Sequence, residues 1–214
     1  MFVLSETPSI ANQFLAEMRN VDIQKDRMRF RTNLTRLGEI FAYEISKSFT
    51  FVQTEVQTPL SMATVLTPNI QPVIVAVLRA SLPFYQGFLN FFDHAESGFI
   101  GAFRQEKEGE DISINLGYHA SPYLEGKEVI LADPMLATGK SFISSINKLC
   151  EHGKPSKIHI AAAFAAPEGI QYIQNNLKLP YSLWIGVIDE KLNDKSYIVP
   201  GLGDAGDLAF GTKL

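Results

Sequence analysis

The sequence is poor in the residues that build disulfides and metal centres. It has one cysteine, Cys150, in 214 residues, and its four histidines are scattered along the chain. One cysteine cannot form an internal disulfide, and no Cys/His cluster has the spacing of a zinc site. A reduced setting, and with it a cytoplasmic location, is therefore the default expectation.

Long apolar runs and an excess of positive charge are also missing. No stretch reaches about 18 consecutive apolar residues, and the first residues do not combine a basic segment with a long apolar run. The formal net charge is −4, which gives the whole chain no electrostatic reason to bind nucleic acid or an anionic membrane. We expect a soluble, non-exported protein that captures any anionic ligand by local geometry.

No internal repeat, low-complexity tract or long linker marks a domain boundary. With 46% hydrophobic residues, the chain can bury a large core, and we expect a single domain over residues 1–214. Apolar side chains recur at three- and four-residue spacing within residues 31–46, for example Leu34, Leu37 and Phe41. This spacing lines one face of a helix, so the first quarter is predicted to be helical.

From residue 73 onward the pattern changes to short β-branched apolar runs, each followed by turn residues and a helical segment. The predicted strands are VIVAVL (73–78), GFIGAF (98–103), EVILA (128–132), KIHIAAAF (157–164) and SLWIGVI (182–188). Near-continuous apolar character predicts burial on both faces, as in a parallel sheet flanked by helices. His159 lies inside one such run and is expected to be a core residue.

About five such strands indicate an open, doubly wound α/β sheet rather than a barrel. DISINLGYHA (111–120) alternates more between apolar and polar residues, and it is interpreted as part of an exposed hairpin near the sheet edge. Ligands of open sheets bind beyond the carboxyl ends of the strands. We therefore expect the chemistry at that end.

The segment DPMLATGKS (133–141) follows the predicted strand 128–132 and opens a helix. A helix start offers unpaired N–H groups and a positive dipole end, which can hold a phosphate. The plainer alternative is that Thr138 or Ser141 caps the helix and Gly139 makes the turn. Lys140 completes a near match to a P-loop, but Pro134 stands where that loop has its first glycine. A carboxylate at Asp133 suits sugar hydroxyls better than a triphosphate.

This strand, acidic residue and T-G-x-S loop resembles the phosphoribosyl diphosphate (PRPP) loop of the type I phosphoribosyltransferases. The form DPMLATG resembles the uracil phosphoribosyltransferases in particular, which have glycine where this chain has Lys140. The resemblance implies an open parallel sheet flanked by helices, with an N-terminal helical segment and a small hood or hairpin. It implies that Asp133 holds the ribose hydroxyls and that the loop binds PRPP through Pro134, Met135, Leu136, Ala137, Thr138, Gly139, Lys140 and Ser141.

Two arginines extend the resemblance. Arg79 follows the strand 73–78 in LRAS, where the family usually has L-R-A-G, so Ser81 replaces a glycine. Arg104 follows the strand 98–103. A guanidinium can bond two diphosphate oxygens at once and stays charged. The resemblance assigns both to the diphosphate of PRPP, whereas an ordinary surface ion pair is the alternative for each.

The segment YIVPGLGDAGD (197–207) is the most specific match. Taken alone, it is a flexible glycine-rich tail. Its resemblance to the family's uracil loop implies that uracil contacts Ile198, Gly203, Asp204 and Ala205, with Asp204 also facing PRPP. Backbone N–H and C=O groups can bind the alternating edge of uracil.

The resemblance implies transfer of 5-phosphoribose from PRPP to uracil, giving UMP and diphosphate, with Asp133, Arg79 and Asp204 as catalytic residues. Mg²⁺ is expected through PRPP and water, without dedicated protein ligands. The expected partners are these small molecules, not nucleic acid or membrane, and a homodimer or higher homo-oligomer. Some family members respond to GTP, but no residue here predicts such activation. Two alternatives stay open: a P-loop kinase or NTPase that uses Lys140, and a pyrimidine-responsive RNA-binding regulator on the same fold.

Overall fold

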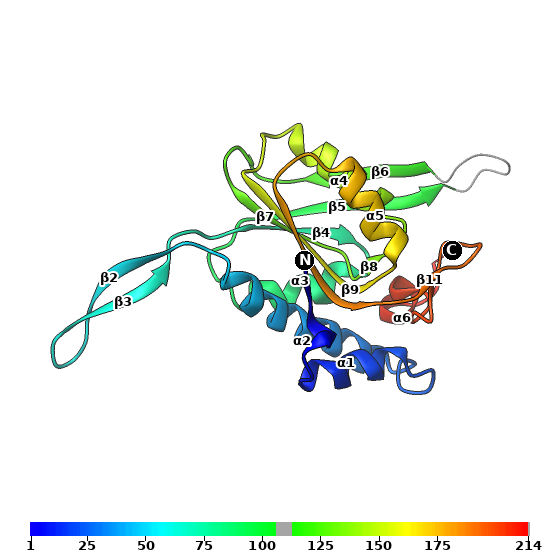
Figure 1. Ribbon diagram of the computed structural model, residues 1–214, viewed down its shortest axis with the longest axis horizontal. Helices are drawn as coiled ribbons and strands as arrows, with labels where there is room; N and C mark the ends of the chain where they lie inside the picture. The colour runs from blue at the N-terminus through cyan, green and yellow to red at the C-terminus, as the bar shows by residue number, and fades with distance from the viewer. Residues whose placement is uncertain (106–112, 214) are drawn as a thin grey trace.

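The computed structural model describes residues 1–105 and 113–213, and the side chains of 102–116 lie outside this description. A sheet forms the centre of the molecule (Figure 1). Its strand order is β1-β10-β9-β7-β4-β5-β6, with β8 paired to β9. The strands are β1 (Phe2–Val3), β4 (Val73–Leu78), β5 (Ser97–Gln105), β6 (Ser113–Ala120), β7 (Glu128–Ala132), β8 (Met135–Leu136), β9 (Lys157–Ala165) and β10 (Tyr181–Ile188).

The pairing in this sheet is parallel except between β5 and β6. The predicted open α/β sheet is confirmed, and each of the five apolar runs forms one of its strands. The prediction that 111–120 contributes to a hairpin at the edge is confirmed for β6, which is the last strand in the order. Residues 111 and 112 lie outside the described part of the chain.

Helices cover both faces of the sheet (Figure 1). They are α1 (Ile10–Arg19), α2 (Arg27–Ser46), α3 (Ser81–Leu89), α4 (Lys140–Cys150), α5 (Pro167–Asn176) and α6 (Ala205–Phe210). Alternation along β4 divides the core, because Ile74 and Ala76 join a cluster with α2 and α3. Val73, Val75 and Val77 join the cluster under α4 and α5. Such two-sided burial is what the continuous apolar runs predicted.

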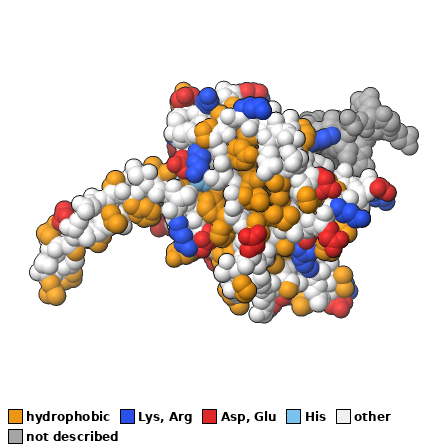
Figure 2. Space-filling view, viewed as in Figure 1, with side chains coloured by type: hydrophobic (Ala, Val, Ile, Leu, Met, Phe, Trp, Pro, Cys, Tyr) orange, Lys and Arg blue, Asp and Glu red, His pale blue; other side chains and the backbone are white. Residues whose placement is uncertain are grey.

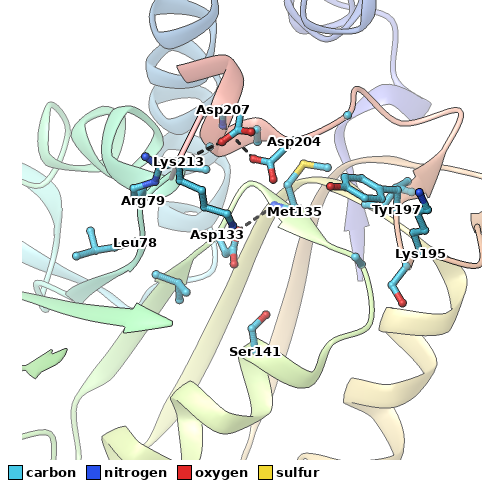
Figure 3. A pocket seen from close by; sticks show the side chains of 18 of the residues that line it. Leu78, Arg79, Asp133, Met135, Ser141, Lys195, Tyr197, Asp204, Asp207 and Lys213 are labelled. Carbon is cyan, nitrogen blue, oxygen red and sulfur yellow. Dashed lines mark hydrogen bonds and ion pairs between the residues drawn. The ribbon is translucent and has the colours of Figure 1, made fainter. Parts of the chain in front are cut away.

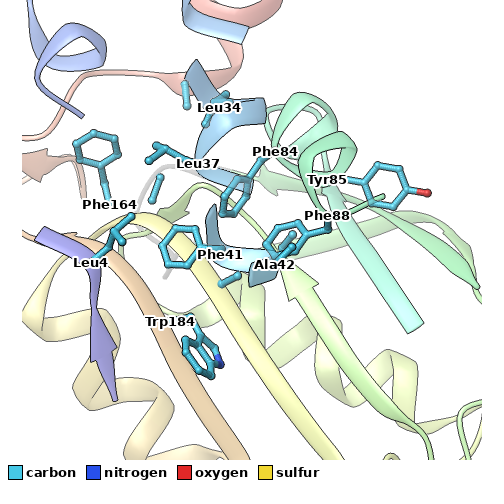
Figure 4. Packing of buried hydrophobic residues seen from close by; sticks show 14 of the residues in the cluster. Leu4, Leu34, Leu37, Phe41, Ala42, Phe84, Tyr85, Phe88, Phe164 and Trp184 are labelled. Carbon is cyan, nitrogen blue, oxygen red and sulfur yellow. The ribbon is translucent and has the colours of Figure 1, made fainter. Parts of the chain in front are cut away.

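Aromatic side chains from α2 and α3 dominate the first of these clusters (Figure 4). The rings of Phe41 and Phe84 meet edge to face with centroids 5.7 Å apart, and Phe84 meets Phe88 at 5.1 Å. Edge-to-face geometry is favourable for aromatic pairs. The predicted N-terminal helix is confirmed as α2, which begins at Arg27, four residues before the predicted range, and covers one sheet face together with α3.

His159 is fully buried in β9, as expected for a core residue. Trp184 donates its indole N–H to His159 Nδ1 at 3.1 Å, and Glu128 Oε2 lies 2.8 Å from Nε2. Because Nδ1 accepts, Nε2 must carry the proton in the neutral ring. Burial lowers the pKa of His159 despite the neighbouring carboxylate. His159 is therefore a structural residue of the core.

Two segments were not predicted from the sequence. β2 (Phe51–Gln57) and β3 (Met62–Pro68) form an antiparallel hairpin that projects away from the sheet (Figure 1). β11 (Lys191–Leu192) and β12 (Ile198–Val199) form a short second hairpin near the C-terminal helix. Within the described residues, no helix combines the length and hydropathy needed to span a membrane.

An ion pair between the buried Glu17 and the half-exposed Arg29 joins α1 and α2. Glu17 accepts two hydrogen bonds from Arg29, at 2.7 and 2.9 Å, and one from Asn33 at 2.8 Å. These bonds lower the pKa of Glu17 from 4.5 to about 2. A carboxylate that is favoured in the folded state stabilises that state above its unfolded pKa, and the stabilisation is lost as the pH falls toward the folded pKa.

We expect Glu17→Gln to destabilise the protein by about 1–3 kcal/mol at neutral pH, because hydrogen bonds to a charged group are lost. The difference from the wild type should shrink as the pH falls from 4.5 toward about 2. Urea denaturation at several pH values measures it. Glu44→Gln, which removes the more exposed pair with Lys47, is the matched control and should have little effect at any pH. A pH-independent difference for Glu17→Gln would contradict this account.

Candidate active site

A cleft of about 1260 Å³ opens at the carboxyl ends of β4 and β7, where the parallel sheet was expected to bind its ligand. Most of its lining comes from segments that are distant in the sequence: the turns after β4 and β7, the β11–β12 hairpin and the start of α6 (Figure 3). Charged groups of both signs line it. They are Arg79, Asp133, Asp194, Lys195, Asp204, Asp207 and Lys213.

The segment after β7 is held against the sheet before it becomes a helix. Asp133 N–H donates to Ala161 C=O at 3.1 Å, and Pro134 C=O accepts from Phe164 N–H at 2.9 Å. Asp133 Oδ1 accepts from Met135 N–H at 3.1 Å, which turns the chain directly after the strand. These hydrogen bonds and the pairing of β8 with β9 fix the position of the loop that follows β8.

Gly139 is the residue before α4 and has a φ of 75°, a conformation that glycine adopts without strain. No side chain caps α4 through this position, so the first-turn N–H groups are available to a ligand. Thr138 Oγ1 accepts only a long bond, 3.4 Å, from Lys140 N–H. The capping alternative for Thr138 thus has weak support, and the turn at Gly139 is present as expected.

The predicted loop residues divide into two groups. Asp133, Met135, Ala137 and Ser141 line the cleft. The side chains of Pro134 and Leu136 are buried, and the cleft lining does not include Thr138, Gly139 or Lys140. Lys140, the residue that completes the near match to a P-loop, therefore does not line the cleft.

Arg79 reaches the cleft from the turn after β4. Its Nη2 lies 3.2 Å from Asp207 Oδ1, which joins this turn to α6 across the cleft (Figure 3). The peptide bond between Leu78 and Arg79 is cis. Ser81, which replaces the family's glycine, is fully buried and donates to Val77 C=O at 2.6 Å. The substitution thus adds a hydrogen bond across the base of the turn.

Arg104 lies on β5, paired in register with Ile114 of β6. Its side chain falls outside the described residues, so its predicted contact with diphosphate stays a prediction.

The glycine-rich segment brings together all four residues that were predicted to contact the base. Ile198, Gly203, Asp204 and Ala205 line the cleft. Asp204 Oδ1 accepts from Asp207 N–H at 2.9 Å and caps α6. The segment forms a turn followed by α6, which packs on α2, and is not the glycine-rich tail that was its interpretation without the family resemblance.

Sequence reasoning missed several cleft residues. Lys195 and Tyr197 come from the β11–β12 hairpin, and Lys213 follows α6 (Figure 3). The turn signal Asn193-Asp194, between Leu192 and the apolar pair Ile198-Val199, could have indicated this hairpin. Asp207 lay inside the quoted motif, but its ion pair with Arg79 depends on the fold.

Gly169 packs behind the loop 133–141, the predicted phosphate loop. It lies in the first turn of α5, and a Cβ there would approach Ala137 C=O to 2.3 Å and Leu136 C=O to 2.9 Å. The helix can pack directly on the loop backbone only because this residue has no side chain. No pattern in the sequence predicted this contact between α5 and the loop after β7.

Magnesium is the metal that the family resemblance implies. In the described part of the chain no group of three or more His, Cys, Asp or Glu side chains could hold a metal ion. The carboxylates of Asp133, Asp204 and Asp207 nevertheless line the cleft, and hard oxygen ligands suit Mg²⁺. This donor set fits an ion that is bound mainly by a phosphorylated substrate and water.

A sequence profile of the family "uracil phosphoribosyltransferase" matches residues 4–212. The chain belongs to this family. A uracil phosphoribosyltransferase from Porphyromonas gingivalis is 46% identical over 206 residues, covering 96% of this chain and 95% of that protein. One from Pyrococcus furiosus is 36% identical, covering 99% and 90%. A solved structure of a protein from Aquifex aeolicus covers both chains completely, with 31% identity and a TM-score of 0.87. The resemblance that the motifs indicated is therefore confirmed along the chain.

Proposed function

We propose that this chain is a uracil phosphoribosyltransferase that transfers 5-phosphoribose from PRPP to uracil, with UMP and diphosphate as products. The observation that carries the proposal is the meeting, in one cleft, of the phosphate loop, Arg79 and the glycine-rich segment. The family match supports the same reaction. We take residues 1–214 as one catalytic domain in a cytoplasmic protein.

PRPP occupies the side of the cleft formed by the turns after β4 and β7. Its 5'-phosphate lies at the start of α4, where Ala137 and Ser141 line the cleft and the helix dipole favours an anion. Asp133 accepts hydrogen bonds from the ribose hydroxyls. Arg79 binds the diphosphate through its planar guanidinium, and Arg104 adds a second cation.

Uracil lies against the glycine-rich segment. Ile198 gives an apolar surface, and the backbone at Gly203 to Ala205 meets the hydrogen-bonding edge of the base. Asp204 stands between the base and PRPP. Because backbone groups do the recognition here, base selectivity depends on the loop's conformation more than on its side chains.

The chemical step breaks the C1–O bond of PRPP and forms the C1–N1 bond of UMP, and the N1 proton of uracil is released to water. Positive charge develops on the ribose ring and negative charge on the departing diphosphate, so orientation and electrostatic stabilisation are the main contributions of the protein. Asp133 and Asp204 lie on the ribose side, and Arg79 lies on the diphosphate side. Mg²⁺, when bound with PRPP, neutralises part of the diphosphate charge.

Equilibrium binding distinguishes this proposal from a P-loop NTPase. Calorimetric titration with Mg²⁺ and PRPP, UMP or ATP is the experiment. PRPP and UMP should bind, whereas ATP should not displace PRPP, because Lys140 is outside the cleft lining and Pro134 replaces the P-loop glycine. Tight ATP binding that excludes PRPP would overturn the proposal. The RNA-binding regulator has no support from the net charge of −4.

The β2–β3 hairpin supports assembly as a homodimer or higher homo-oligomer. Between residues 51 and 68 it carries one charged residue, Glu55, and several exposed apolar side chains along its length (Figure 2). A lone two-stranded hairpin is only marginally stable in water. Its apolar surface suits a partner, and symmetric association with a second copy is the commonest assembly.

Leu60→Glu combined with Leu66→Glu is expected to dissociate this assembly. These side chains are 96% and 67% exposed, so the charges do not disturb the monomer core. Sedimentation velocity should show an oligomer for the wild type and a monomer for the double variant. Met28→Glu, at a 68% exposed position on α2, is the control and should keep the oligomer. A monomeric wild type, or an unchanged mass for the double variant, would contradict the role of the hairpin.

A further inference from the structure

A buried carboxylate lies next to the glycine-rich segment but does not line the cleft. Asp189 directly follows β10, and its side chain is 4% exposed. Its Oδ1 accepts from Arg19 Nη2 at 2.5 Å, and its Oδ2 accepts from Gly201 N–H at 3.0 Å. Burial of a charge is costly unless it is paired and hydrogen-bonded, and here each oxygen has its own donor.

The carboxylate is held on a rigid frame. Asp189 N–H donates to Ala165 C=O of β9 at 2.8 Å. Arg19, the last residue of α1, lies with its guanidinium carbon 4.8 Å from the centre of the Phe164 ring. The Arg19 guanidinium and the Asp189 carboxylate are thus fixed by α1, β9 and β10.

The bond to Gly201 acts on the middle of the glycine-rich segment. Gly201 has a φ of 55°, and a Cβ there would lie 2.1 Å from Ile198 C=O, so the chain turns sharply at this residue. Ile198 on one side and Gly203 on the other line the cleft. Moving the Gly201 N–H would therefore move both walls of the base subsite.

We propose that Asp189, held by Arg19, is a positioning residue that fixes the glycine-rich segment for base recognition. The inference rests on the proposed function, which makes uracil the ligand of that segment. Backbone recognition demands accurate placement, and a segment rich in glycine cannot supply it from its own side chains. The hydrogen bonds from Arg19 to Asp189 and from Gly201 to Asp189 fix the segment relative to α1.

Asparagine at position 189 has the same shape but cannot satisfy both donors. Its amide has one acceptor oxygen, so its NH₂ group would face either the Arg19 guanidinium or the Gly201 N–H. Asp189→Asn should raise KM for uracil about tenfold or more, in line with the loss of a charged hydrogen bond. KM for PRPP should stay within about twofold, because the PRPP side of the cleft is untouched. Arg19→Met should also raise KM for uracil.

The matched control is Glu17→Gln. It removes another ion pair of α1, that of Glu17 with Arg29, and neither residue lines the cleft. It should lower the melting temperature without changing either KM. A second readout needs no turnover: amide hydrogen exchange of residues 198–205 should be faster in Asp189→Asn and Arg19→Met than in the wild type and Glu17→Gln.

The possible outcomes are separable. If the wild type makes no UMP, the proposed function fails, and hydrogen exchange alone decides the positioning role. Unchanged exchange in Asp189→Asn, or equal rises in KM for uracil and PRPP, would overturn the inference. So would a matching rise in KM for uracil in Glu17→Gln, since loss of stability alone would then explain the effect.

Discussion

Arg79→Ala is expected to lower kcat/KM for PRPP about 100-fold or more, the size of effect seen when one preorganised donor to developing charge is removed. Arg79 lines the cleft and brings a positive charge to it from the turn after β4. Initial rates at varied PRPP concentration measure it. Arg79→Lys should recover only part of the loss, because an ammonium group cannot form the two-pronged bond to diphosphate oxygens.

Asp207→Asn is the control for this prediction. Asp207 pairs with Arg79 at 3.2 Å, and Arg79→Ala also breaks that pair. The pair is half-exposed and contributes little to stability. We expect Asp207→Asn to change kcat/KM far less than Arg79→Ala. Equal losses for the two variants would contradict a direct role of Arg79 in binding diphosphate.

Gly169→Ala is expected to damage PRPP binding although Gly169 does not line the cleft. The added methyl would lie 2.3 Å from Ala137 C=O, so α5 or the phosphate loop must move. Overpacking of this kind costs about 1–3 kcal/mol in stability. Displacement of the Ala137 backbone should raise KM for PRPP about tenfold, because small misplacements at a binding site have large effects.

Thermal denaturation and steady-state kinetics on the same preparation separate the two consequences of Gly169→Ala. Gln174→Ala, at an exposed position of the same helix, should change neither stability nor KM. A folded Gly169→Ala variant with wild-type KM for PRPP would show that the loop is not supported through this contact.

The sheet was predictable because its strands are buried on both faces. The runs at 73–78 and 128–132 match β4 and β7 in both bounds, since continuous apolar residues leave little freedom in placing a central strand. The hairpin at 51–68 was not predicted. Its strands are exposed on both faces, so they lack the alternation that a half-buried strand shows.

The candidate site was predictable where a motif is local. Asp133, Arg79 and the residues 203–205 were found from short segments, and all of them line the cleft. Contacts between distant segments were not predictable. The pairing of Arg79 with Asp207 and of Asp189 with Arg19 joins residues 128 and 170 positions apart, and no local pattern encodes such a distance.

Formation of UMP from PRPP and labelled uracil is the measurement that tests the central claim most directly. Purified protein with Mg²⁺ should release UMP and diphosphate in equal amounts, and cytosine or hypoxanthine in place of uracil should give no nucleotide. Arg79→Ala, prepared in parallel, should be nearly inactive. Absence of UMP under conditions where another uracil phosphoribosyltransferase is active would contradict the account.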